Sequence, residues 1–119
     1  MFDFHESPKG TGSTGFYMFI YSERNRNLAN NIIEMLQNHH VEIENEYVYY
    51  QIFKAKNGII HLPWIVNMLT MHFGRMATTG LYFNNIKTEK VFVFETSMAQ
   101  NLNDRWTTNL LVMKYLVGL

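Results

Sequence analysis

The clearest hydrophobic pattern of the chain lies between residues 16 and 38. Residues 16–21 form a continuous apolar and aromatic run, which is typical of a strand buried on both faces of a sheet. Ser22 or Asn25 can cap a helix after this strand. One apolar stripe at helical spacing follows, formed by Leu28, Ala29, Ile32, Ile33 and Leu36. The pattern therefore predicts a central strand followed by an amphipathic helix that ends near residue 38.

Residues 41–53 alternate between apolar and polar positions as a strand does, but the phase changes near Asn45 and Glu46. A bulge or a bend explains such a change. Asn57 and Gly58 form the strongest two-residue hairpin signal in the chain, because both positions accept positive φ. We therefore expect residues 47–56 to pair with residues 59–62.

The last half of the chain predicts two more helices and a second hairpin. Pro63 suits the start of a helix that ends at Gly74 or Gly80. Residues 81–83 and 91–95 form the next expected strand pair. Residues 97–100, Ser-Met-Ala-Gln, match a capping box for a final helix. That helix carries one apolar stripe, formed by Met98, Leu102, Trp106, Leu110, Met113 and Val117.

The expected element order is β-α-β-β-α-β-β-α. Its first six elements fit the split β-α-β pattern of ferredoxin-like folds. We therefore predict a single α+β domain over residues 16–119, with a ferredoxin-like sheet, a second hairpin and a C-terminal helix. Residues 1–15 end in a Gly-, Ser- and Thr-rich stretch and are predicted to be a flexible arm.

That stretch spells a glycine motif, Gly10-Thr11-Gly12-Ser13-Thr14-Gly15. A dinucleotide site needs these glycines after a strand and at the start of a helix. Here they precede the first strand, so they are interpreted as a linker.

Composition removes several classes of function. The chain has 119 residues, of which 47% are hydrophobic and 17% charged, below the roughly 25% charged residues of an average domain. Ten basic side chains balance ten acidic ones, so no global field attracts nucleic acid or an anionic membrane. The absence of cysteine excludes disulfides and thiol chemistry. With no long apolar run and no basic-apolar leader, we expect a cytoplasmic protein without membrane partners.

No set of residues has the spacing of a catalytic or metal site. His39 and His40 are adjacent and would point apart on a helix. Glu42, Glu44 and Glu46 share one strand face, and a solvated edge explains them. We predict no catalytic, cofactor-binding or metal-binding residues, and favour a non-catalytic protein while leaving enzymatic activity open.

Two functions remain. Eight methionines and eighteen aromatic residues exceed what one small core needs, and such residues are favoured at protein contacts. The leading hypothesis is a protein-interaction module, such as a viral accessory or inhibitor protein, that binds a protein partner or forms a homo-oligomer. Its expected contact residues are Phe2, Phe4, Trp64, Met68, Met71 and Trp106.

The alternative is a single-stranded nucleic-acid binder. Such proteins stack bases on aromatic rings and hold phosphates with cations at the rim. The expected aromatic face contains Tyr17, Tyr21, Tyr47 and Tyr49. The expected basic rim contains Arg24, Arg26, Lys54 and Lys56.

Overall fold

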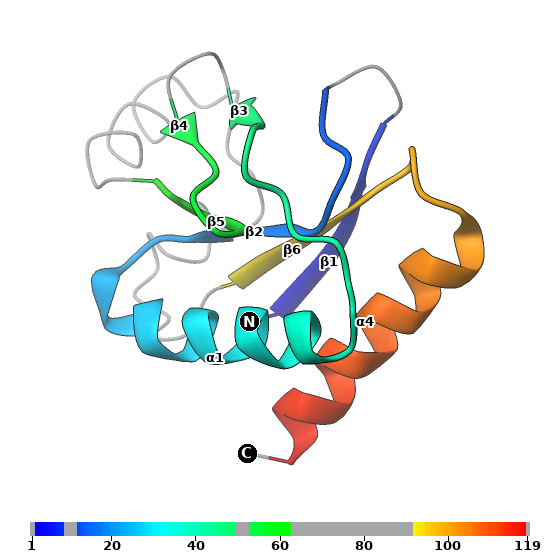
Figure 1. Cartoon of the computed structure of the whole chain (residues 1–119). Coiled ribbons are helices and arrows are strands. Elements are labelled where there is room, and N and C mark those ends of the chain that lie inside the picture. Colours follow the sequence, from blue (N-terminus) through cyan, green and yellow to red (C-terminus); the bar gives the residue numbers. More distant parts are fainter. Residues whose placement is uncertain (1, 9–11, 50–52, 63–91, 119) are drawn as a thin grey trace.

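A computed structural model describes residues 2–8, 12–49, 53–62 and 92–118. At its centre lies a four-stranded sheet (Figure 1), whose strands in spatial order are β1 (Phe2–Ser7), β6 (Phe92–Ser97), β2 (Tyr17–Ile20) and β5 (Ile59–His61). β1 runs parallel to β6, β6 antiparallel to β2, and β2 parallel to β5. A separate two-stranded pair consists of β3 (Val48–Tyr49) and β4 (Phe53–Lys54).

Two helices cover one face of this sheet (Figure 1). The 3-10 turn η1 (Glu23–Asn25) leads from β2 into α1 (Arg26–Asn38), and α4 (Leu102–Val117) follows β6. The predicted strand and helix of residues 16–38 are confirmed, and Ser22 caps the entry by accepting from the Arg24 N–H. A mixed α+β unit with a four-stranded sheet and a C-terminal helix is thereby established.

An apolar layer covers each face of the sheet. The helix side buries one set of side chains, among them Phe16, Met18, Ile32, Leu36, Phe92 and Phe94. The opposite side buries a second set, among them Tyr17, Phe19, Ile60, Leu62 and Val93, with Tyr47 and Phe53 packed against it. β2 contributes to both layers because its successive side chains point to opposite faces. This explains why its sequence is apolar at every position.

The segment predicted to be a flexible arm instead begins with β1. Six consecutive residues pair with β6, from Phe2 opposite Phe92 to Ser7 opposite Ser97. Phe2 and Phe4 alternate with Asp3 and His5, the two-residue period of a strand with one apolar face. The arm prediction is wrong for residues 2–7, because their partner strand lies ninety residues later in the sequence and no local pattern reveals it.

The predicted hairpin of residues 47–62 is correct only at its turn. Asn57 and Gly58 have φ of 49° and 74°, and Lys56 and Ile59 exchange two backbone hydrogen bonds of 3.0 Å. Beyond the turn, however, β5 pairs with β2, and β4 pairs with β3 in an antiparallel arrangement. Parallel pairing with β2 places Ile59 and Ile60 inside the two apolar layers.

The start of the last helix also differs from the prediction. Ser97 is the final residue of β6, and its hydroxyl donates to the Ser13 carbonyl at 2.7 Å. Asn101 is the N-cap of α4: its carbonyl Oδ1 accepts from the Asp104 N–H at 2.8 Å. The expected second helix and residues 81–83 lie outside the described residues.

Glu44 holds the end of the glycine-rich stretch through three hydrogen bonds. Its Oε2 accepts from the Thr14 N–H at 3.0 Å, the Gly15 N–H at 2.9 Å and the Thr14 hydroxyl at 3.2 Å. The residue is only 2% exposed, so the expected solvated face holds for Glu42 and Glu46 but not for Glu44. The N–H groups of Thr14 and Gly15 thus bond within the chain, in agreement with a linker rather than a phosphate loop.

Candidate functional site: the outer face of the C-terminal helix

The most unusual surface of the described chain is one side of α4. Five large apolar side chains point outward there, with exposed fractions between 44% for Met113 and 88% for Val117. We call this set the α4 outer face; it consists of Leu102, Trp106, Leu110, Met113 and Val117. Their spacing of three or four residues aligns them along one side of a helix. The stripe predicted for this helix therefore exists, but it faces solvent.

The opposite side of α4 explains this orientation. Val112 and Thr108 are buried, and Leu111, Tyr115 and Leu116 pack against the helix-side layer. Arg105 also forms an ion pair with Glu6 of β1, which ties this side of the helix to the sheet edge. The helix thus has two apolar sides, and the one that contains Tyr115 and Val112 packs inward.

The α4 outer face is large for a protein of this size. Its exposed fractions correspond to on the order of 600 Å² of accessible surface, at the upper end of the largest apolar patches on monomeric proteins. Trp106, at its centre, is 66% exposed. Tryptophan is enriched among the residues that dominate binding energies at protein contacts. The patch therefore has the composition and extent of a contact surface.

Of the other predicted protein-contact residues, only part can be placed. Phe2 is 42% exposed and stacks on Phe92 with 5.8 Å between ring centroids. Phe4 is half-buried and packs on Phe94 at 5.0 Å, so it belongs to the core rather than to a contact surface. Trp64, Met68 and Met71 lie outside the described residues.

The aromatic face expected for nucleic-acid binding is mostly interior. Tyr17 and Tyr21 are 3% and 5% exposed, so neither ring can stack on a base. Tyr47 is half-buried against Tyr17, with 5.0 Å between the centroids. The side chain of Tyr49 lies outside the described part of the structure. Burial of these rings in the second apolar layer contradicts the predicted stacking platform.

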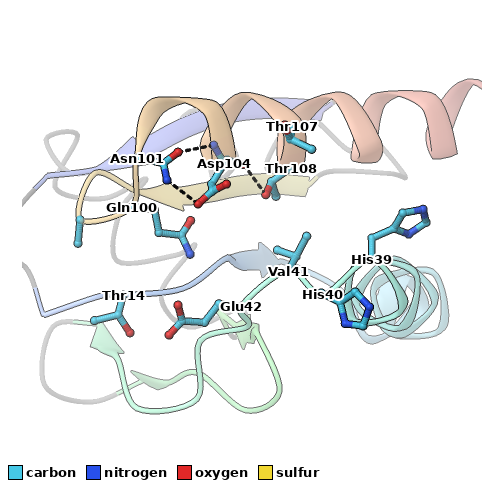
Figure 2. A pocket seen from close by; sticks show the side chains of 11 residues that line it. Thr14, His39, His40, Val41, Glu42, Gln100, Asn101, Asp104, Thr107 and Thr108 are labelled. Carbon is cyan, nitrogen blue, oxygen red and sulfur yellow. Dashed lines mark hydrogen bonds between the residues drawn. The ribbon is translucent and has the colours of Figure 1, made fainter.

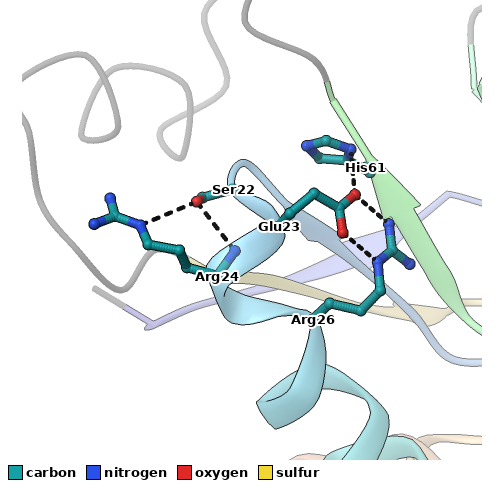
Figure 3. Close-up of polar contacts among 5 residues, drawn as sticks. All are labelled: Ser22, Glu23, Arg24, Arg26 and His61. Atoms are coloured by element: carbon teal, nitrogen blue, oxygen red, sulfur yellow. Dashed lines mark hydrogen bonds and ion pairs between the residues drawn. The ribbon is translucent and has the colours of Figure 1, made fainter.

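The expected basic rim divides into two parts. Arg26, Lys54 and Lys56 line one groove, together with His61. Arg24 does not line it: its Nε donates to the Ser22 hydroxyl at 3.4 Å (Figure 3). Three of the four predicted cations are thus brought together by the fold, although they come from separate segments of the chain.

Sequence reasoning missed a polar network across β1, β2 and β6. The Ser7 hydroxyl donates to Glu95 Oε2 at 3.2 Å and lies 2.7 Å from the Tyr17 hydroxyl. Because Ser7 has one hydroxyl proton and gives it to Glu95, Tyr17 donates to Ser7. On the same sheet face, Asp3 Oδ2 is 2.8 Å from His5 Nε2. The alternation of Asp3, His5 and Ser7 with Phe2 and Phe4 was the available signal.

Burial governs ionisation in this network. It raises the pKa of Glu95 to about 6, partly offset by attraction to His5 and by the Ser7 hydrogen bond. Burial likewise raises the pKa of the Tyr17 hydroxyl well above its ordinary range, and the nearby Glu95 charge adds to this effect. Both shifts favour the neutral forms. Tyr17 therefore stays protonated at neutral pH, whereas Glu95 loses its proton as the pH rises through about 6.

One cleft lies between the end of α1 and the start of α4 (Figure 2). It has a volume of about 570 Å³ and is bordered by His39 and His40 at the end of α1, Glu42, and Asp104 near the start of α4. Asp104 is already bonded to the Asn101 amide at 2.8 Å. Within the described ranges, no group of three His, Asp or Glu side chains is placed to hold a metal ion.

The chain has no significant match among protein-family models, curated proteins or solved structures. Neither α1 nor α4, nor any other helix of the described segments, combines the length and apolarity needed to cross a membrane. Functional inference therefore rests on the surfaces of this chain alone.

Proposed function

We propose that this protein is an interaction module that self-associates through the α4 outer face. The observation that carries the proposal is the outward position of Leu102, Trp106, Leu110, Met113 and Val117 on a single helix. Exposure of that much apolar surface costs free energy in water, and contact with an equally apolar surface recovers it.

The spacing of the residues suits a two-fold antiparallel pairing of two α4 helices. The face spans sixteen residues, about 24 Å at the rise of an α-helix. Placing two copies of Leu110 at the centre brings Trp106 of one copy opposite Met113 of the other, and Leu102 opposite Val117. Tryptophan and methionine form favourable sulfur–aromatic contacts. The same patch then serves both copies, as a closed two-fold interface requires.

Charge and area support a second copy as the partner. The chain has no net charge, so two copies do not repel each other over long range. Each copy would contribute on the order of 600 Å², against about 800 Å² per partner in a standard stable interface. We therefore expect a dimer of moderate affinity, in the micromolar range.

Sedimentation velocity of the full chain between about 1 and 200 µM tests this proposal. The wild-type chain should shift from monomer to dimer within that range. Leu110→Glu and Trp106→Glu should remain monomeric, because each places a charge within the buried interface. Thr107→Glu is the matched control: Thr107 is exposed on the same helix but outside the apolar set. It should dimerise as the wild type does.

Folding must be preserved for the comparison to count. Leu110 and Trp106 are exposed in the monomer, so circular dichroism and the thermal midpoint measured at low concentration should match the wild type. A wild-type chain that stays monomeric at 200 µM would refute self-association. If the tryptophan fluorescence of a monomeric Trp64→Phe variant, which reports Trp106 alone, resists iodide quenching, another part of the same chain covers the face.

Two further expectations concern nucleic-acid binding and the arrangement of the sheet. A nucleic-acid binder that uses a tyrosine sheet face is no longer proposed, since Tyr17 and Tyr21 are buried. The ferredoxin-like arrangement stays a prediction; the parallel pairing of β2 with β5 departs from the hairpin-based order expected for residues 47–62.

A further inference from the structure

A second, smaller groove lies where the start of α1 meets β4 and β5. Its volume is about 300 Å³, and it is lined by Arg26, Phe53, Lys54, Lys56, Ile59, Ile60 and His61. No residue of α4 is among them, so the groove is separate from the α4 outer face. We call it the basic groove.

Positive charges outnumber negative charges around the basic groove. Arg26 is paired: its Nε and a terminal nitrogen donate to the two carboxylate oxygens of Glu23 at 2.7 and 2.8 Å. Glu23 Oε1 also lies 2.9 Å from His61 Nδ1 (Figure 3). Lys54 and Lys56 have no acidic partner within 4.0 Å among the described residues. One carboxylate therefore faces three permanent cations, and the groove has a net positive charge.

The fold brings these cations together from separate segments of the chain. They do not form a basic run in the sequence. Arg26 begins α1, Lys54 ends β4, and Lys56 precedes the Asn57-Gly58 turn. Cations held close together repel each other unless an anion sits between them. The whole chain is neutral, so the groove is a local positive field that can attract an anion.

One wall of the basic groove is apolar. Phe53 is half-buried and packs against the layer that contains Ile60, whereas Ile59, which also lines the groove, belongs to the opposite layer. A cationic rim next to an aromatic ring matches the way proteins hold a phosphate and stack the attached base. The volume lies at the lower limit for small-molecule sites and suits one ring with one phosphate. Phe53 is the single aromatic residue among the described lining residues, which limits stacking to one base.

We propose that the basic groove binds a phosphate-bearing ligand with one aromatic ring, the chemistry of a single nucleotide. Lys54 and Lys56 hold the phosphate, Phe53 stacks on the ring, and Arg26 joins the phosphate contacts when Glu23 releases it. The nucleotide can be free or a unit of a single strand, and these two sources share the same recognition chemistry.

Isothermal titration of the full chain with adenosine 5′-monophosphate tests the proposal, with adenosine and inorganic phosphate as partial ligands. The nucleotide should bind at least tenfold more tightly than either part. Replacing both lysines, K54Q together with K56Q, should weaken binding at least tenfold. Glu23→Gln should strengthen it several-fold, because the competing carboxylate is removed. Lys114→Gln, on α4 and away from the groove, is the matched control and should leave binding unchanged.

The results that overturn the proposal are equally definite. Absence of nucleotide binding at millimolar concentration refutes it, as does equal weakening in the lysine pair and in K114Q. All substituted side chains are exposed or half-buried, and an unchanged thermal midpoint verifies the fold of each variant. A labelled eight-residue oligothymidylate distinguishes the two sources. Binding tighter than that of the monophosphate and steeply weakened by salt assigns the groove to single strands; equal affinity assigns it to free nucleotides.

Discussion

Glu95 makes the stability of the fold depend on pH in a direction opposite to most carboxylates. It lies on β6 beside Ser7 and Tyr17, and His5 and Asp3 share the same sheet face. Burial raises the pKa of Glu95 from 4.5 to about 6. The folded state therefore holds this proton more tightly than the unfolded state, so stability falls as pH rises between about 4.5 and 6.

The size of the effect follows from the two pKa values of Glu95. A difference of 1.5 between 4.5 and about 6 corresponds to about 2 kcal/mol of unfolding free energy, lost in full above about pH 7. Glu95→Gln replaces the carboxyl group with a neutral amide that can still accept from Ser7. The unfolding free energy of the variant, relative to that of the wild type, should therefore rise by about 2 kcal/mol from pH 4 to pH 7.5.

Urea unfolding at pH 4, 5, 6 and 7.5 measures this difference directly. Comparing the variant with the wild type at each pH cancels the contributions of ionisable groups that do not interact with Glu95. Glu46→Gln is the control, since it makes the same chemical change at an exposed position. The reasoning is refuted if the Glu95→Gln difference changes by less than about 0.5 kcal/mol across the range, or if the variant becomes relatively less stable at high pH.

Three other substitutions test the local structure by urea unfolding at neutral pH. Glu44→Gln should cost about 2 kcal/mol of unfolding free energy, because a buried carboxylate acceptor for Thr14 and Gly15 is weakened. The hydrogen bonds outweigh burial and lower the pKa of Glu44. The stability that Glu44 contributes should therefore fade as pH falls below about 4.5. Gly58→Ala should cost about 3 kcal/mol, since φ is +74° and the new Cβ would lie 2.6 Å from Ile43 Cγ2. His40→Gly should stabilise by about 0.5 kcal/mol, because His40 follows the C-cap of α1, His39, and has a φ of 61°. The opposite sign in any of these would contradict the local geometry described.

Local patterns predicted the elements whose residues lie close in sequence. The strand and helix of residues 16–38 and the turn at Asn57 and Gly58 depend on neighbouring side chains and on φ preferences. β1 was missed because its six residues become a strand only against β6, a partner that no sequence period identifies. The same limit applies to β5, whose pairing with β2 competed with the local hairpin.

For the candidate site, the sequence predicted the members of the apolar stripe but not its direction. Trp106 was expected at a protein contact, but no orientation followed from the sequence for the stripe as a whole. A helix with apolar residues on two sides, such as α4, can pack through either one. Tertiary contacts, such as the ion pair of Arg105 with Glu6, decide which side of α4 packs inward. Hydrophobic periodicity in the sequence does not reveal these contacts.

The pairing of β1 with β6 also has a consequence for how the chain matures on the ribosome. Phe2–Ser7 leaves the exit tunnel well before its partner strand, which ends at Ser97, ninety residues later. At typical rates of synthesis β1 waits roughly 5 to 20 s before that partner emerges. During this interval Phe2 and Phe4 cannot pair with β6, so this nascent segment is a target for chaperones. Insertion of this edge strand is then expected among the last steps of folding, since distant contacts form slowly.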